Sequence, residues 1–207
     1  DLSRYLSARG NYYVLATRPS VLNREEIPRR VDLFVMSHCP FGNKAEEAMR
    51  EVMEALPEIE VRLWFIADER DGQFSSMHGQ EEVNEDIRQV CIAEKFPDKL
   101  WDYLACINPV YRDSATKWRE CAEKVGINAA AIEECWQGDE GKRLFSENIK
   151  FANRLGFGGS PTFLINNRYV ATGLRSADEL KNMICAVNPD LSGCGKQLST
   201  STGMPPG

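Results

Sequence analysis

The predicted fold depends on residues 31–44, which read Val-Asp-Leu-Phe-Val-Met-Ser-His-Cys-Pro-Phe-Gly-Asn-Lys. The first five are largely apolar, with β-branched and aromatic members, and this composition predicts a buried strand. After a short turn at Ser37 and His38, apolar residues recur at the spacing of a helix. These residues are Ala45, Ala48, Met49, Val52, Met53 and Leu56. Cys39 therefore falls where a strand ends and a helix begins.

The position of Cys39 at this junction is expected to affect how readily its thiol ionises. Unpaired backbone N–H groups and the helix dipole favour a thiolate at a helix N-terminus. Pro40 fits the first helical turn because its missing N–H costs nothing there. We therefore expect Cys39 to be a free thiol that ionises more readily than an ordinary cysteine. The alternative is a buried structural cysteine before an ordinary helix.

Composition narrows the class of protein. The 207 residues are 43% hydrophobic, enough for one domain with a real core or for one domain carrying an insertion. The net charge is −6, and acidic and basic residues are interspersed, so no basic stripe indicates a nucleic-acid partner. No apolar run is long enough to span a membrane. No signal peptide is recognisable, and Asp1 reads as a processed or trimmed start.

The seven cysteines indicate a redox compartment. Six follow Cys39 at wide spacings, without the close pairs of a zinc site, and the adjacent His38 and Cys39 make only a weak metal-binding pattern. We therefore expect no metal. Three disulfides plus one free thiol account for the odd number and predict an extracytoplasmic location, whether periplasmic, secreted or lumenal. A cytosolic protein with reduced thiols is the alternative.

The spacing of the six cysteines also predicts their pairing. Cys91–Cys135 and Cys106–Cys121 share a midpoint near residue 113, so helices folding back there would form a nested pair. Crossed and sequential pairings remain open, because helix rotation could favour them. The third expected pair is Cys185–Cys194, which closes a short loop containing Pro189.

Periodicity divides the chain. A strand over 59–66 completes a β-α-β unit, with Cys39 at the carboxyl end of the first strand, where open α/β sheets bind their ligands. Helical periodicity fills residues 80–155, with Ser114 and Asn128 as expected helix caps. A hairpin turning at residues 166–167 and a last helix from Ser176 or Asp178 follow. From residue 199 the composition indicates a disordered end or linker.

Cys39-Pro40 after a strand, and Gly159-Ser-Pro-Thr162 before a hairpin and a last helix, resemble the thioredoxin superfamily. The helical segment resembles its DsbA-like branch. Residues 77–155 are similar to the gamma-interferon-inducible lysosomal thiol reductases. The matching residues are His78, Gly79, Glu82, Asn84, Cys91, Cys106, Cys121, Cys135, Gly138, Gly141, Leu144 and Asn148.

The resemblance covers about residues 31–186 and implies an α/β thioredoxin fold with an inserted all-helical subdomain. Together with the composition of the two ends, it divides the chain into five expected segments. These are an N-terminal arm or linker (1–30), the first half of the thioredoxin fold (31–79), the helical insertion (80–155), the second half (156–187) and a C-terminal tail (188–207).

The resemblance also implies a site. Cys39 and Pro40 are the expected catalytic residues, and His38, Phe41, Ser160 and Pro161 are the expected substrate-binding residues. Pro161 would follow a cis peptide bond and face the thiol; an ordinary trans proline opening a strand is the alternative. His38 would either favour the thiolate as a cation or act as a polar turn residue, and we favour the turn. For His78 we expect a hydrogen-bonding role at the surface.

One departure from the family decides the functional hypotheses. The family motif is Cys-x-x-Cys, but residue 42 is glycine, so the second step of dithiol exchange has no local thiol. We expect a monothiol oxidoreductase or isomerase that needs no cofactor and acts on protein thiols and disulfides or a low-molecular-weight thiol. The alternative is a thioredoxin-fold binding or structural subunit of a larger assembly, without redox turnover.

Overall fold

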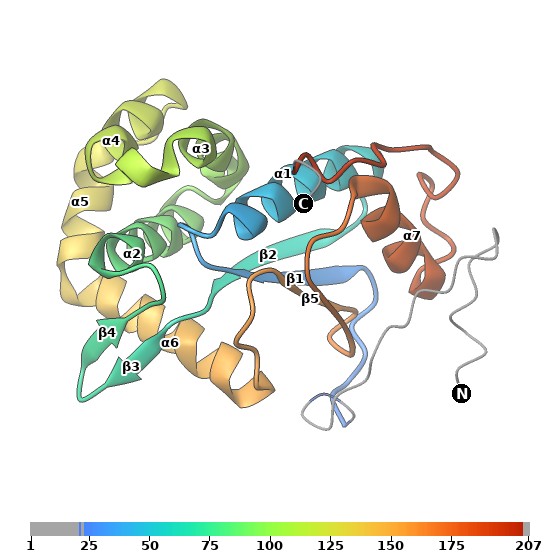
Figure 1. Ribbon diagram of the computed structural model, residues 1–207, viewed down its shortest axis with the longest axis horizontal. Coiled ribbons are helices and arrows are strands. Elements are labelled where there is room, and N and C mark those ends of the chain that lie inside the picture. The colour runs from blue at the N-terminus through green and yellow to red at the C-terminus, as the bar shows by residue number, and fades with distance from the viewer. Residues whose placement is uncertain (1–20, 22, 205–207) are drawn as a thin grey trace. The chain divides into compact units, whose positions relative to one another are not determined.

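The structure is a computed structural model that describes residues 21 and 23–204. It divides into two compact units (Figure 1). Among the described residues, the first unit comprises residues 21, 23–33, 44–62 and 161–204, and the second comprises residues 34–43 and 63–160. Most of the expected N-terminal arm, residues 1–20 and 22, lies outside the described residues, as do residues 205–207.

The first unit is built on a four-stranded sheet of order β2-β1-β5-β6. Its strands are β1 (Arg30–Val35), β2 (Glu60–Phe65), β5 (Thr162–Ile165) and β6 (Tyr169–Thr172), and the ends of β1 and β2 continue into the second unit. β5 and β6 are antiparallel, with Ile165 opposite Tyr169. The two turn residues, Asn166 and Asn167, have φ of 51° and 60°, a conformation that asparagine tolerates better than most residues. The expected hairpin turn is therefore confirmed.

Two helices complete this unit. Helix α1 (Pro40–Ala55) begins in the second unit and buries Ala45, Met49 and Val52 on one face. Helix α7 (Ala177–Val187) begins with a capping box, in which the Ser176 and Glu179 side chains each bond the other residue's backbone N–H. The helix therefore starts at the first of its two expected positions.

The C-terminal segment is more ordered than its composition predicts. Ser199 donates its N–H to Glu51 of α1 at 2.8 Å, and its carbonyl accepts the N–H of Asp178 at 3.0 Å. Cys194 is joined to Cys185 at the end of α7 by a disulfide. The chain is therefore held at Ser199, where the expected free linker would begin, because both backbone groups of this residue find partners on two helices.

The second unit is mostly helical, and Figure 1 shows its helices gathered in one group. The helices are α2 (Gln80–Lys95), α3 (Leu100–Ile107), α4 (Ser114–Lys124), α5 (Ala129–Gln137) and α6 (Asp139–Leu155), with 3-10 turns at Pro97–Lys99 and Asn108–Asp113. A small hairpin of β3 (Asp68–Arg70) and β4 (Gln73–Ser75) precedes them. Sequence periodicity does not predict this hairpin, because strands of three residues are too short to show a period of two.

Covalent and aromatic contacts hold the second unit together. Disulfides join Cys91 to Cys135 and Cys106 to Cys121, in the nested arrangement expected from the sequence. They link α2 to α5 and α3 to α4. Phe34, near the end of β1, packs edge-on against Phe157 with ring centroids 4.8 Å apart, and it also stacks with Trp64. The strand that leads to Cys39 is thus anchored in the core of this unit.

Candidate active site around Cys39

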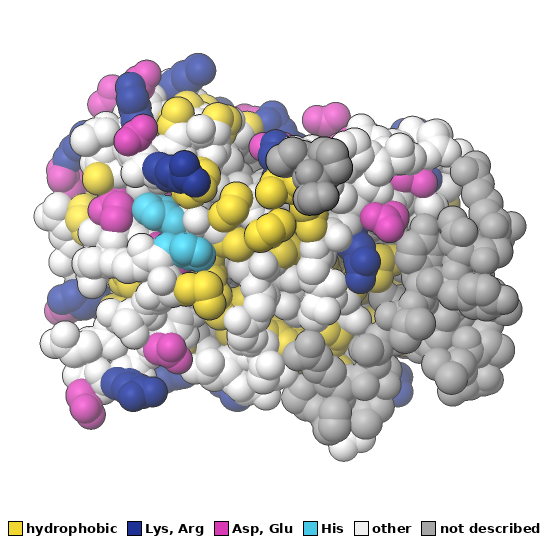
Figure 2. Space-filling view, viewed as in Figure 1, with side chains coloured by type: hydrophobic (Ala, Val, Ile, Leu, Met, Phe, Trp, Pro, Cys, Tyr) yellow, Lys and Arg dark blue, Asp and Glu magenta, His cyan; other side chains and the backbone are white. Residues whose placement is uncertain are grey.

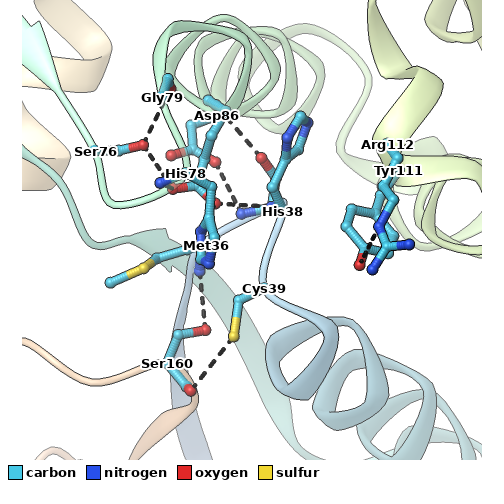
Figure 3. A network of polar contacts seen from close by, with 12 residues as sticks. Met36, His38, Cys39, Ser76, His78, Gly79, Asp86, Tyr111, Arg112 and Ser160 are labelled. Atoms are coloured by element: carbon cyan, nitrogen blue, oxygen red, sulfur yellow. Dashed lines mark hydrogen bonds and ion pairs between the residues drawn. The ribbon is translucent and has the colours of Figure 1, made fainter.

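Cys39 lies in the turn between β1 and α1 (Figure 3). Its N–H donates to the Met36 carbonyl at 3.0 Å, and its own carbonyl accepts the N–H of Asn43 in the first turn of α1. The Sγ atom lies 3.7 Å from the Ser160 carbonyl oxygen, to which the thiol donates. Cys39 is 8% exposed and is the only free cysteine; the other six form disulfides.

Two carboxylates of helix α2 hold the turn that precedes the thiol. Asp86 Oδ1 accepts the N–H of Ser37 at 3.1 Å, and Glu82 Oε2 accepts the N–H of His38 at 2.9 Å. The two acidic residues are four apart in the helix and therefore share a face. Both are fully buried. Consecutive amides of the turn before Cys39 are thus fixed from the helical part of this unit.

Glu82 also binds the loop before α2. Its Oε1 accepts the Ser76 hydroxyl at 2.6 Å and the His78 N–H at 3.2 Å, while its Oε2 lies 2.7 Å from His78 Nδ1. This partly exposed histidine therefore has a hydrogen-bonding role, and it shares one carboxylate with the turn of Cys39. Figure 2 shows the two histidines, the cyan side chains, reaching the surface next to each other.

The hydrogen bonds of His38 define which ring nitrogen carries a proton, and its burial bears on its charge. Its Nε2 lies 2.9 Å from Ser114 Oγ, and that hydroxyl donates to Glu81 at 3.1 Å, so Nε2–H is the donor in the first bond. Burial lowers the pKa of His38 below its usual 6.5, although the charges of Glu82, Glu85 and Glu81 oppose the shift. His38 is therefore neutral at pH 7, which favours a turn residue over a cation beside the thiol.

The burial of Asp86 changes the pKa of its carboxyl group. Complete burial raises the pKa of its carboxyl well above the usual 3.8, hydrogen bonds from Ser37 act in the opposite direction, and the charge of Glu82 adds to the rise. Buried acids with a raised pKa occur often at functional sites, and Asp86 bonds the turn that precedes Cys39.

Ser160 is the expected site residue that the structure brings closest to Cys39. Besides its carbonyl contact with Sγ, its hydroxyl accepts the N–H of Met36 at 3.0 Å. Pro161 is buried but belongs to the first unit, and the cis geometry of the Ser160–Pro161 bond stays a prediction. Pro40 is the first residue of α1 and is partly buried. Phe41 is 48% exposed and leaves an apolar surface two residues after the thiol.

The sequence did not identify the functional roles of Glu82, Asp86 and Ser114. We expected Ser114 to cap a helix, but it is the first residue of α4, and its hydroxyl binds His38 and Glu81 instead. A signal for the two acids was present. They interrupt the buried face of α2 that carries Val83, Ile87 and Val90, and acids are rarely buried there without a partner.

Two further properties hold for the described residues. No three or more of their histidines, cysteines and acids are grouped so as to hold a metal ion. None of their helices combines the length and the apolar character needed to cross a bilayer.

With this geometry in place, comparison with known proteins gives a consistent assignment. Two protein-family models match the sequence: the DSBA-like thioredoxin domain over residues 92–184, and the gamma interferon inducible lysosomal thiol reductase over residues 30–125. None of the curated protein sequences matches the chain.

Solved structures similar to the chain have the same fold. A candidate protein disulfide isomerase from Nitrosomonas europaea superposes with a TM-score of 0.65 at 14% identity, covering 79% of this chain and 98% of the other. A thioredoxin-like oxidoreductase from Silicibacter pomeroyi gives 0.56 at 19% identity, with 84% and 98% covered. The thiol-disulfide exchange protein alpha-DsbA2 from Wolbachia pipientis gives 0.57 at 12% identity, with 79% and 83% covered.

The fold is thus the α/β class in which a thioredoxin sheet carries an added group of helices. Within that class, the chain has the DsbA-like thioredoxin fold, with sequence matches to both the DsbA-like and the lysosomal thiol reductase families. The resemblance expected from the sequence is confirmed.

Proposed function

We propose that the protein is a thiol–disulfide oxidoreductase of monothiol type, in which Cys39 attacks disulfides of other proteins. The observation that carries the proposal is a single free thiol at the N-terminus of the 16-residue helix α1, in a chain whose other six cysteines form disulfides. The attacking species in thiol–disulfide exchange is the thiolate form of such a cysteine.

Such a site performs exchange without net oxidation. The Cys39 thiolate attacks one sulfur of a substrate disulfide, forms a mixed disulfide and releases the other substrate sulfur as a thiolate. A second substrate thiolate then attacks the substrate sulfur of the mixed disulfide and returns Cys39 as a thiolate. One disulfide is broken and one is formed, so this isomerase reaction requires no cofactor. Net reduction requires two electrons from an external thiol.

The surrounding residues have separate roles in this reaction. Glu82 and Asp86 hold the turn through the amides of His38 and Ser37, which limits the positions that the thiol can take. The Ser160 carbonyl contacts the sulfur in the resting state. Phe41 offers exposed apolar surface to a polypeptide substrate, and we propose His38 and Pro161 as further substrate-binding residues.

We also propose an extracytoplasmic location. Three disulfides in one chain of this size are typical of oxidising compartments, since cytosolic thiols are kept reduced. The proposed partners are therefore cysteine-containing proteins in the periplasm, outside the cell or in a lumen, together with a low-molecular-weight thiol of that compartment.

A second function has one observation in its favour. Cys39 is only 8% exposed, and glycine replaces the second cysteine of the motif, as expected for a thioredoxin-fold subunit that binds partners without turnover. The two functions differ in whether the thiol reacts.

The deciding experiment is reactivation of scrambled ribonuclease in a glutathione buffer, with Cys39→Ser as the control. We expect the wild-type protein to accelerate reactivation, the control to be inactive, and insulin reduction by the wild type to be poor. We also expect a substrate-linked mixed disulfide that forms only when Cys39 is present. If reactivation stays at the level of the control and iodoacetamide leaves Cys39 unmodified, the binding function is correct instead.

A further inference from the structure

Gly42 is a glycine because there is no space for a side chain. It lies in the first turn of α1 and its φ is not in the left-handed region, so its backbone conformation does not demand glycine. A Cβ built at this position would lie 2.6 Å from Ser160 Oγ, and 3.3 Å from both the Met36 carbonyl oxygen and Val35 Cβ. Real Cβ atoms essentially never lie within 3.0 Å of such a neighbouring atom, so one of these groups would have to move.

The atom in closest conflict is held in place. Ser160 Oγ accepts the N–H of Met36 at 3.0 Å, and Met36 is 5% exposed. If the hydroxyl rotated away, it would leave a buried backbone N–H without its acceptor, which costs the desolvation of that group. The serine therefore resists making room. The backbone carbonyl of Ser160 accepts a hydrogen bond from the Cys39 thiol, as Figure 3 shows.

We propose that Ser160 is a specificity-determining residue that keeps this site limited to one thiol. Its hydroxyl occupies the place from which the side chain of a second cysteine would start, and its hydrogen bond to Met36 keeps it there. Glycine at position 42 and serine at position 160 are thus a matched pair, and replacing the glycine alone does not restore a dithiol site.

The pair also specifies where the releasing thiol comes from. After Cys39 forms a mixed disulfide, the Ser160 hydroxyl and the Met36 and Val35 atoms fill the space beside position 42. The thiolate that attacks the mixed disulfide therefore arrives with the bound substrate or as a small thiol, from the side where Phe41 is exposed. This consequence rests on the proposed function, whereas the steric pairing of the two residues does not.

The test uses Gly42→Cys, with and without Ser160→Ala, and measures closure of a disulfide between Cys39 and the introduced thiol. Ser160→Ala removes the only atom closer than 3.3 Å. Each protein is equilibrated over a range of glutathione disulfide to glutathione ratios, alkylated and analysed by mass, with the three native disulfides checked by peptide mapping. In Gly42→Cys alone, the introduced side chain can take the position needed for closure only if the Ser160 hydroxyl leaves its buried hydrogen bond to Met36. The double variant has no such bond to break, so we expect closure to be favoured about tenfold or more. Gly42→Cys with Ser160→Thr, which keeps the hydroxyl, should behave like Gly42→Cys alone.

If Gly42→Cys closes as readily as the double variant, the proposal is wrong.

A second measurement avoids redox chemistry altogether. Gly42→Ala should lower the Tm of the wild type and leave that of Ser160→Ala unchanged or higher, because alanine is the better helix former once the space is free. Equal losses in both backgrounds would also overturn the proposal. Neither measurement uses a substrate, so a negative ribonuclease assay leaves both results interpretable.

Discussion

The amide pair Asn166–Asn188 of the first unit and the carboxylate pair Glu82–Asp86 of the second are both buried, but they differ in chemistry. The amides bond each other in both directions, at 3.1 and 2.9 Å, and both accept the N–H of Arg29 at 3.0 Å. The acids accept hydrogen bonds from the turn before Cys39, and the pKa of Asp86 is raised by burial.

The difference separates a network that does not titrate from one that does. Neutral amides that satisfy each other have the same hydrogen bonds at every pH, and they join the hairpin turn to the end of α7. Carboxylates exchange protons with solvent, so their network depends on pH. The acids Glu82 and Asp86 lie against the candidate active site, and acids with a perturbed pKa occur often at functional sites.

The largest effect should come from the amide network. Asn188→Ala removes one of the two acceptors of Arg29 N–H, the donor to the Ile184 carbonyl, and both bonds to the Asn166 side chain, which is left partly unpaired. With about 1–3 kcal/mol for each buried group left unsatisfied, we expect a loss of roughly 3 kcal/mol in the free energy of unfolding. The loss should be nearly the same at pH 5 and pH 7 in urea titrations. A marked pH dependence would show that the network is not a neutral one.

The next effect concerns Glu82, the acid with most partners. In the wild type, the donors to Glu82 share two carboxylate oxygens. Glu82→Gln replaces one of these oxygens by an NH2 group, so either the turn amide or the His78 loop loses its acceptor. We expect a loss of about 1–3 kcal/mol in stability and a several-fold change in the rate of Cys39 alkylation. Glu94→Gln, at an exposed position of the same helix, is the matched control. Unchanged alkylation in Glu82→Gln would show that the turn does not need this carboxylate.

A third prediction uses the protonation of Asp86. Its pKa is raised on folding, so the native state binds the extra proton and the contribution of this group falls as pH rises from the usual 3.8 towards the raised value. Wild type should therefore lose more stability than Asp86→Asn between pH 4 and pH 7. Parallel stability curves for the two proteins would contradict the raised pKa.

The smallest effect is expected at His38. Burial lowers the pKa of this histidine, so it carries no charge at pH 7 that a substitution could remove. His38→Gln keeps a donor for Ser114. The alkylation rate of Cys39 at pH 7 should therefore change by less than about threefold, well below the tenfold change that a difference of about 1.4 kcal/mol in activation free energy would give. A much larger drop would restore the cation hypothesis.

The sequence predicts much of this architecture for physical reasons. The helices of residues 80–155 have several turns each, so their apolar period is easily recognised, and Asn128 caps α5 by accepting two N–H groups as expected. The nested disulfides agree with the equal spacing of their cysteines about one connection, which favoured this pairing without excluding the others. Cys39 was recognisable because a strand end and a helix start are local features.

The rest of the site depends on contacts between distant residues. Ser37 lies 49 residues from Asp86, and Met36 lies 124 residues from Ser160, and no local pattern encodes either pair. The sequence identified Gly42 as a missing thiol, but only the structure shows that a serine hydroxyl occupies the place. Ser114 illustrates the same limit, since its hydroxyl looks like a cap until His38 is seen beside it.

The position of Glu82 and Asp86 on α2 has a consequence for engineering. A designer who wished to shorten this chain to a minimal thioredoxin scaffold would naturally delete residues 80–155, because the strands and α1 lie outside them. That truncation would remove both acceptors for the amides of Ser37 and His38. A shortened scaffold would therefore need new acceptors for those two N–H groups before its cysteine could hold the same geometry.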